Sequence, residues 1–354
     1  MKTIAYFVTD SGFGHITRSV AIIANILSNS DYNVLIISNK DQDNHARIGL
    51  LDYEKRVSFA IADTDANSVF YNNSLKVDVE STTAAVRTYM ENLDDYIEDT
   101  YNLLKGLDIT TVVTDISILG IMVAKKLRAK VIGISNYTWY NRFKSLGLDE
   151  DILDFYQKWY NKLDILLRFQ FPDDMTGISC PIEDVGLVCR EVDMMSSSDY
   201  KHRYWPAIYL SIGQVEKKKE VFEVDFPQGT IFATGAIEIT GSTYLLKLPQ
   251  RVSHTQDYIA ASSLALIKGG WSSVAECLIL GIPFGILEQG DTEDEELVNK
   301  LFDEKLAFKT TEDELRNFSI KDLNIKSTKL IKKRFPNDAE HISKRIIEIS
   351  KDSK

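Results

Sequence analysis

Residues 11–18 read SGFGHITR and join an apolar run at 2–8 (KTIAYFV) to a stretch with apolar residues at helical spacing, 15–28. This pattern predicts a buried strand, a Gly-rich turn and a helix. In an open α/β sheet such a turn lies at the carboxyl edge of the strands, where ligands bind. Gly12 and Gly14 would let a ligand approach the backbone, and the start of the helix would favour an anion or another hydrogen-bond acceptor.

Two common phosphate-binding motifs are excluded at this turn. Thr17 stands where a dinucleotide-binding turn has its third glycine, and the second expected strand ends in the residues 38–40 (SNK) rather than at an acid. No Gly-Lys-Ser/Thr follows, so the turn is not a P-loop. His15 remains, with Arg18 one helical turn later. Histidines are more often structural, but at this edge of a sheet we expect His15 to contact a ligand or to catalyse.

Asp115 ends another short β-branched run, TTVVT at 110–114, and opens a helical stretch at 116–127. As a helix N-cap it would accept a hydrogen bond from the N–H of Ser117 or Ile118. As a functional residue it would hold His15 in the tautomer that offers a free nitrogen to a hydroxyl, and would stabilise the imidazolium. The two roles are compatible, and the sequence leaves both open.

Short strands alternate with helical stretches through both halves of the 354 residues, a pattern typical of parallel sheets covered by helices. Between the halves lies FPDDMTGISCPIEDVG at 171–186, rich in Pro, Gly and Asp, which indicates a boundary. We therefore expect an N-terminal Rossmann-like domain at 1–175, a C-terminal Rossmann-like domain at 176–330 and a helical tail at 331–354.

Composition places the chain among ordinary globular proteins, with 44% hydrophobic and 26% charged residues. A net charge of −11 argues against broad binding of nucleic acid or anionic membranes. The basic segment at 326–345 is expected to be a solvated helical tail, with contact to a membrane surface or to a partner as the alternative. Three cysteines are too few for a disulfide framework, and without a signal peptide or an apolar run of ~20 residues we expect a cytoplasmic protein.

A second strand, Gly-turn, helix unit reads IKGGWSSVAEC at 267–277. Gly269 and Gly270 would form the turn, and Ser272 or Ser273 would cap the helix. Such a helix start suits a phosphate, to which Lys268 would add charge. Glu276, about one turn in, would accept hydrogen bonds from the ribose hydroxyls, although the segment could also be only a tight turn. The expected donor site comprises Gly213 (in SIGQV), Lys268, Gly269, Gly270, Trp271, Ser272, Ser273, Glu276, Glu295 and Glu296.

Glu295 and Glu296 belong to an acid-rich loop and helix at 288–301, and either could contact sugar hydroxyls. Most of these carboxylates are expected to be solvated near a helix start, and no metal site is expected from them.

A second open question concerns the aromatic stretch after the strand at 130–135. Trp139 and Tyr140 would either stack on a sugar ring or belong to a core helix.

The ordered motifs resemble those of the GT-B glycosyltransferase superfamily, whose fold is two Rossmann-like domains facing each other across a cleft. SGFGHITR resembles the family's Gly-His-x-x-Arg loop, and residues 267–288 resemble its donor-binding segment. The chain is most similar to the glycosyltransferase-like N-terminal region of plant L-arabinokinases and its free-standing microbial relatives. That resemblance rests on SGFGHITR, VVTDISILG, VIGISNYTWYN, KGGWSSVAEC and the two glutamates followed by Leu301. Kinase motifs are absent, so arabinokinase activity is not implied.

The resemblance implies an inverting, metal-independent transferase with a nucleotide sugar as co-substrate and no other cofactor. His15 would be the general base on the acceptor hydroxyl and Asp115 its partner, while the turns of the second domain would hold the diphosphate. Glu295 and Glu296 stand where many relatives have amides, which puts the sugar in question. The acceptor side would comprise Gly12, Phe13, Gly14, Arg18, Asn136, Trp139 and Tyr140.

We therefore expect a glycosyltransferase that uses a nucleotide sugar, with a UDP-sugar as the first candidate and an unidentified acceptor. Two alternatives stay open. A nucleotide-sugar epimerase of the same fold would need acids around the sugar, for which Glu295 or Glu296 could serve. A non-catalytic module that binds nucleotide sugars would keep the fold and lose the turnover.

Overall fold

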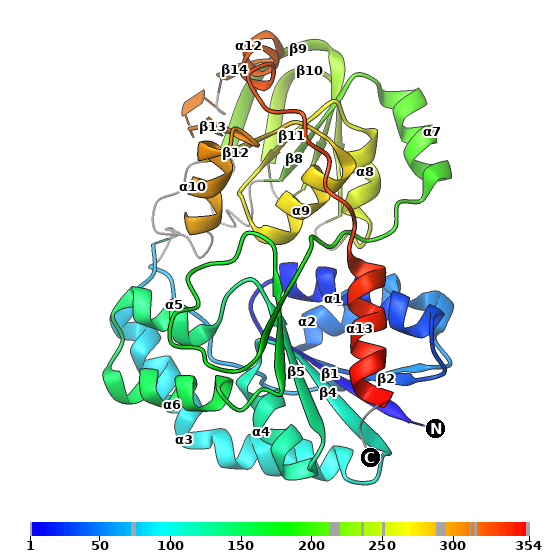
Figure 1. Ribbon diagram of the computed structural model, residues 1–354. Helices are drawn as coiled ribbons and strands as arrows, with labels where there is room; N and C mark the ends of the chain where they lie inside the picture. Colours follow the sequence, from blue (N-terminus) through cyan, green and yellow to red (C-terminus); the bar gives the residue numbers. More distant parts are fainter. Residues whose placement is uncertain are drawn as a thin grey trace. The chain divides into compact units, whose positions relative to one another are not determined.

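The computed structural model describes residues 2–71, 76–211, 220–234, 237–249, 252–287, 295–311, 313–314 and 317–351 (Figure 1). The chain forms two compact units. Unit 1 comprises Met1–Leu187 and Asp338–Lys354, and unit 2 comprises Val188–Asn337. In the described part of the chain, no helix combines the length and the apolar character that crossing a membrane requires.

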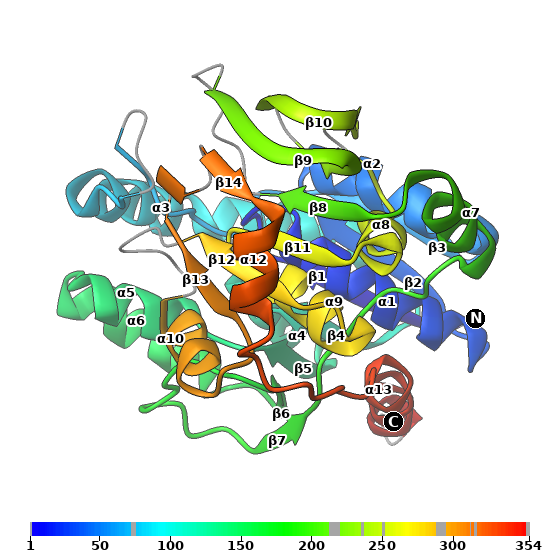
Figure 2. The same cartoon turned by 90° about the horizontal axis from the view of Figure 1, so that it is seen from above.

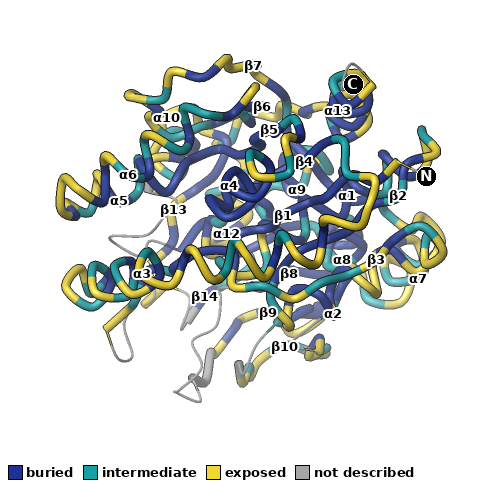
Figure 3. Tube along the Cα trace, turned by 90° about the horizontal axis from the view of Figure 1, so that it is seen from below, coloured by how far each residue is buried: buried dark blue, intermediate teal, exposed yellow. Residues whose placement is uncertain are grey.

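Unit 1 is built on a parallel sheet of seven strands in the order β3-β2-β1-β4-β5-β6-β7. Each strand is a short run rich in apolar or β-branched residues. β1 is buried along its whole length and β4 over its last five residues, as the dark blue tube in Figure 3 shows. The strands are β1 (Thr3–Val8), β2 (Asn33–Ser38), β3 (Val57–Ile61), β4 (Ile109–Asp115), β5 (Lys130–Ser135), β6 (Ile165–Phe169) and β7 (Ile182–Val185).

Helices connect these strands and cover the sheet of unit 1 (Figure 1). In one group, α1 packs against α2 and α13; in another, α4 packs against α3 and α6. This is the doubly wound arrangement expected from the alternating pattern. The helices are α1 (Gly14–Ser28), α2 (Lys40–Gly49), the 3₁₀ turn η1 (Leu51–Tyr53), α3 (Val79–Leu104), α4 (Ile118–Leu127), α5 (Trp139–Leu146), α6 (Glu150–Tyr160) and α13 (Ala339–Lys351).

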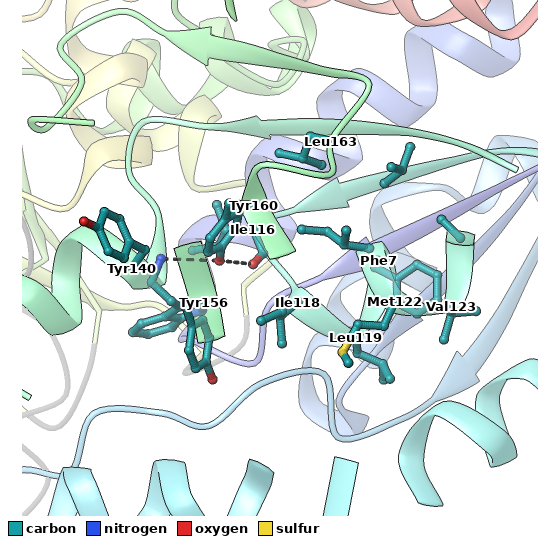
Figure 4. Close-up of a cluster of buried hydrophobic side chains, with 14 of the residues drawn as sticks. Phe7, Ile116, Ile118, Leu119, Met122, Val123, Tyr140, Tyr156, Tyr160 and Leu163 are labelled. Carbon is teal, nitrogen blue, oxygen red and sulfur yellow. Dashed lines mark hydrogen bonds between the residues drawn. The ribbon is translucent and has the colours of Figure 1, made fainter. Parts of the chain in front are cut away.

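The core of unit 1 continues up to the carboxyl ends of β4 and β5. Figure 4 shows Phe7 of β1 and Leu119 of α4 in this cluster, together with Tyr156 and Tyr160 of α6. The hydroxyl of Tyr160 donates a hydrogen bond to the carbonyl of Ile116, 2.6 Å away. The loop between β4 and α4 is therefore fixed by the core beneath it.

Unit 2 has its own parallel sheet, in the order β10-β9-β8-β11-β12-β13, with β14 paired to β9 (Figure 2). Its core contains apolar residues from the central strands, among them Ile208, Leu210 and Leu266. The strands are β8 (Ala207–Ser211), β9 (Glu220–Ala233), β10 (Ile237–Lys247), β11 (Leu264–Ile267), β12 (Phe284–Leu287), β13 (Phe308–Thr310) and β14 (Asn317–Ser319). The helices are α7 (Met194–Tyr204), α8 (Thr255–Ala261), α9 (Trp271–Leu280), α10 (Glu295–Asp303) and α12 (Ile320–Ser327).

The division of the chain differs from the expected boundaries at 175/176 and 330/331. Residues 176–187 stay in unit 1 because β7 pairs with β6, two strands that the sequence analysis did not predict. The segment 331–354, which was expected to be a separate helical tail, is divided between the two units. Its residues 331–337 belong to unit 2, and α13 returns to unit 1, where Ile342, Ile346 and Ile347 are buried. Arg345, one of the basic residues of that segment, forms an ion pair with Glu183 at 2.9 Å.

Candidate active site

The register of two neighbouring strands brings His15 and Asp115 together. β1 and β4 are paired with Val8 opposite Asp115, so both strands end at the same edge of the sheet. α1 begins at Gly14, which places His15 in the first turn of the helix above that edge. Nδ1 of His15 lies 2.9 Å from Oδ1 of Asp115, and only 7% of His15 is exposed. The two residues singled out in the sequence are therefore in contact.

Asp115 does not cap the following helix. Ser117 is the N-cap of α4, and its hydroxyl accepts a hydrogen bond from the N–H of Gly120. The Asp115 carboxylate instead faces α1, where Nε and NH2 of Arg18 donate to its two oxygens at 2.7 and 2.6 Å. Burial by itself raises the pKa of Asp115, but the charge of Arg18, with His15 as a further partner, lowers it to about 2.

Arg18 is buried and spans the ends of three strands. It binds Asp115 at the end of β4, its NH1 donates to Oδ1 of Asn136 at 2.7 Å, and its NH2 lies 3.2 Å from Oγ of Ser135. The guanidinium also lies over the ring of Phe169, 5.0 Å from the centroid. Arg18 and Asn136 were expected on the acceptor side. The structure shows both buried, Arg18 against the His15–Asp115 pair and Asn136 as a hydrogen-bond acceptor for Arg18.

Tyr137 contacts the second ring nitrogen of His15, which the sequence analysis did not foresee. Its hydroxyl lies 3.1 Å from Nε2, and the two rings pack edge to face with centroids 5.7 Å apart. The only sequence signal was its position just after Ser135, the last residue of a strand next to β4. Side chains that follow neighbouring parallel strands meet at one edge, so this position could have indicated Tyr137.

Trp139 is a core residue in this structure. None of its surface is exposed, its ring stacks on Phe143 with centroids 5.3 Å apart, and its Nε1 donates to Oγ1 of Thr9 at 3.1 Å. Tyr140 is also buried, and its hydroxyl accepts a hydrogen bond from Gln157. Stacking of a sugar on Trp139 is therefore wrong for this structure, because no face of the indole reaches solvent.

The Gly-rich loop of unit 1 is held at its base and open at its tip. The side-chain amide of Gln42 donates to the carbonyls of Thr9 and Gly12 at 2.9 and 2.8 Å. Gly12 has a φ of +57°, and a Cβ there would meet nothing within 4 Å. Gly12 and Gly14 are exposed, while Phe13 lies against the ring of His45. The glycine at position 12 thus serves the backbone conformation and leaves the surface accessible.

The second Gly-rich turn connects β11 to α9 in unit 2. Gly270 is the N-cap of α9, and no side chain caps the helix, so neither Ser272 nor Ser273 has the expected capping role. Both lie in the first turn of the helix, after Trp271, which is buried. Gly269 has a φ of +96°, and a Cβ there would lie 2.9 Å from side-chain atoms of both Ile286 and Val298, so close packing requires glycine. Lys268 is exposed.

Glu276 is paired within unit 2. It is 3% exposed, and its Oε1 accepts hydrogen bonds from Nε and NH2 of Arg190 at 3.1 and 2.7 Å. NH2 of Arg190 also donates to Oγ1 of Thr255, and its NH1 donates to the carbonyl of Ser253. The sequence analysis missed Arg190, which lies outside any helix or strand and carries no periodic signal. A ribose would have to share Glu276 with this arginine.

Gly213 lies outside the described residues, as does the side chain of Glu295. Glu296 is exposed and pairs with Lys300 at 3.3 Å. Within the described ranges, no group of three or more His, Cys, Asp or Glu side chains is placed to hold a metal ion.

The fold is shared with several solved structures, among them a glycosyltransferase and an enzyme complexed with a UDP-sugar analogue. CalG4, the calicheamicin glycosyltransferase, has a TM-score of 0.60 at 12% identity, over 98% of this chain and 94% of that chain. UGT2 of Phytolacca americana, solved with UDP-2-fluoro-glucose and pterostilbene, has a TM-score of 0.56 at 12% identity, over 100% and 95%. MurG of Acinetobacter baumannii has a TM-score of 0.53 at 11% identity, over 98% and 100%. No family model and no curated protein matches the sequence. At these identities the likeness shows the fold: the chain has the GT-B fold of two Rossmann-like α/β units.

Proposed function

We propose that this protein is an inverting glycosyltransferase that moves a sugar from a nucleoside diphosphate, UDP first among the candidates, to an acceptor hydroxyl. The observation that carries the proposal is the contact of His15 with Asp115 at the carboxyl edge of β1 and β4. Support comes from solved structures that share the fold, namely the calicheamicin glycosyltransferase CalG4 and UGT2 in complex with UDP-2-fluoro-glucose. Five motifs in the same order further support kinship with the glycosyltransferase-like region of L-arabinokinases.

In the proposed reaction His15 is the general base. Its Nε2 takes the proton of the acceptor hydroxyl while the acceptor oxygen attacks the anomeric carbon from the face opposite the diphosphate. The bond from that carbon to the leaving oxygen breaks, and the configuration inverts. Asp115 stabilises the imidazolium that forms, through the hydrogen bond at Nδ1. Nε2 has one lone pair, which faces the Tyr137 hydroxyl, so the acceptor hydroxyl takes the place of that phenol.

The donor diphosphate is assigned to the start of α9 in unit 2. The helix is ten residues long and has no side-chain cap, and its dipole favours an anion at the first turn. Ser272 and Ser273 lie in that turn and would supply hydroxyl donors. Their role follows from this placement and from the motif, and the leaving group is stabilised by helix and hydroxyl dipoles.

The first experiment measures thermal unfolding against a panel of nucleoside diphosphates and nucleotide sugars. A ligand at 100 times its Kd adds about 2.7 kcal/mol of stability, so one diphosphate and its sugar conjugates should raise the Tm together. His15→Ala should then abolish turnover and leave that shift unchanged, with His202→Ala, an exposed histidine of α7, as the control. The absence of any shift at millimolar ligand would reject the donor site, and retained turnover in His15→Ala would reject the base.

A further inference from the structure

The protons around His15 can be assigned from the hydrogen-bond partners. Nδ1 has two polar neighbours, Oδ1 of Asp115 at 2.9 Å and NH2 of Arg18 at 2.8 Å. These favour opposite tautomers, because the carboxylate needs a proton on Nδ1 and the guanidinium needs a lone pair there. The NH2 group has two hydrogens, and acceptors for both are present: Oδ1 of Asp115 at 2.6 Å and Oγ of Ser135 at 3.2 Å. Nδ1 therefore carries the proton and donates it to Asp115.

This assignment leaves the lone pair of His15 on Nε2. The hydroxyl of Tyr137 is 3.1 Å from that nitrogen and donates to it. The ring is thus held in one tautomer from both sides, with its basic nitrogen on the side away from Asp115. A neutral ring in this tautomer can accept a proton directly from a hydroxyl.

Arg18 also changes the electrostatic environment of the ring. It binds both oxygens of Asp115, so a proton added to His15 gains the attraction of the carboxylate and meets the repulsion of a cation 2.8 Å from Nδ1. Within the described part of the chain, the phenols of Tyr137 and of Tyr6 on β1 are further titratable groups that interact with this cluster. Burial raises the pKa of Tyr6, which stays neutral. Arg18 is therefore the charge that opposes protonation of His15.

We propose that Arg18 is a positioning residue that keeps His15 neutral, with its proton on Nδ1, at pH values where a histidine paired with Asp115 alone would be protonated. The device offsets a disadvantage of a His–Asp pair as a base. A buried carboxylate attracts a proton to the imidazole, and a protonated imidazole cannot act as a base. The consequence for catalysis rests on the proposed function, whereas the protonation state of His15 does not.

The test is ¹⁵N NMR of the full-length protein labelled at its five histidines, with His15→Ala to identify the signal. In the wild type, Nδ1 of His15 should be protonated and Nε2 unprotonated. In Arg18→Met, the titration midpoint of His15 should rise by roughly one to three pH units. Arg18→Lys keeps the charge and should remain close to the wild type. Arg168→Met, which removes another aspartate-paired arginine of unit 1, should leave His15 unchanged.

Two results would overturn the proposal: a proton on Nε2 in the wild type, or a midpoint in Arg18→Met within about 0.3 units of the wild type. If Arg18→Met does not fold, Arg18→Gln, which removes the charge and keeps a hydrogen-bond donor, takes its place, and the same rise in the His15 midpoint is expected and the same limit applies. Once turnover is established, the acid limb of kcat/KM in Arg18→Met should move upward with the NMR midpoint, so that activity lost at neutral pH returns at alkaline pH. If the acid limb of kcat/KM does not move, the proposed effect of Arg18 on catalysis is refuted. If the protein binds no nucleotide, the proposed function fails and the NMR result stands on its own.

Discussion

Replacing Asp115 with asparagine should destabilise unit 1 by roughly 3 to 5 kcal/mol. The side chain keeps its size and one acceptor oxygen, so the change removes mainly the charge that balances Arg18. The fall in the pKa of Asp115 from its ordinary value of 3.8 to about 2 corresponds to roughly 2 kcal/mol in favour of the charged form. The loss of one of the two guanidinium bonds and a buried, unbalanced Arg18 account for the remainder.

The chain has two units, so the free energy of unfolding should be measured for each unit separately. Amide hydrogen exchange followed by mass spectrometry gives this, with peptides from β1 and β4 reporting on unit 1 and peptides from β8 and β11 as the internal control. The double variant Arg18→Met/Asp115→Leu should recover at least half of the loss, because it removes both buried charges. A cost below about 1 kcal/mol, or an equal loss in unit 2, would refute this account of the ion pair.

Four further outcomes are expected. Because the folded-state pKa of Asp115 lies below its ordinary value, the stability that this residue contributes is present above about pH 4 and is lost as the pH falls toward 2. Hydrogen exchange of β4 across this range should show the loss in the wild type, and Asp115→Asn should show none. Tyr137→Phe removes a hydroxyl that competes for Nε2, so the acceptor KM should fall about fivefold with little change in kcat, while an unchanged or higher KM would contradict the competition. Trp139→Ala should cost roughly 3 to 5 kcal/mol in unit 1 and Trp139→Phe less, measured by the same exchange assay; full stability of the alanine variant would contradict a core role. Glu276→Gln should destabilise unit 2 by about 3 kcal/mol because Arg190 loses its ion partner, and a loss of nucleotide affinity without loss of stability would instead favour direct contact with the ligand.

The strands and helices that follow a clear period were predicted from the sequence. The predicted strands correspond to β1 to β5, β8, β11 and β12, and to only the last residues of β9 and β10, at 230–233 and 244–247. The helices α1, α3 and α9 carry apolar stripes at helical spacing. β6 and β7 were not predicted, because one follows a long aromatic helical stretch and the other lies inside a segment rich in Pro, Gly and Asp. Both segments are strands because they pair with neighbouring strands, and such tertiary contacts are not visible in a local sequence pattern.

The candidate site could be predicted only in part. His15 and Asp115 follow strands whose carboxyl ends meet at one edge, so their contact follows from topology. Local patterns could not distinguish Ser117 from Asp115 as the helix cap, since both residues accept hydrogen bonds well at that position. The pairing of Glu276 with Arg190 also depends on side chains 86 residues apart, which no local pattern reveals.

Because α13 belongs to unit 1 but follows unit 2 in the chain, unit 1 can complete its folding only after unit 2 has been synthesised. The residues of α13 are synthesised after the whole of unit 2, yet they cover part of α1, which is synthesised before unit 2. While unit 2 is being synthesised, the part of α1 that packs on α13 is not yet covered by that helix. A nascent chain released before residue 338 would carry an incomplete first unit with an uncovered apolar surface, a form that chaperones and proteases recognise. Synthesis of α13 is therefore the step that covers α1 and completes the apolar core of unit 1.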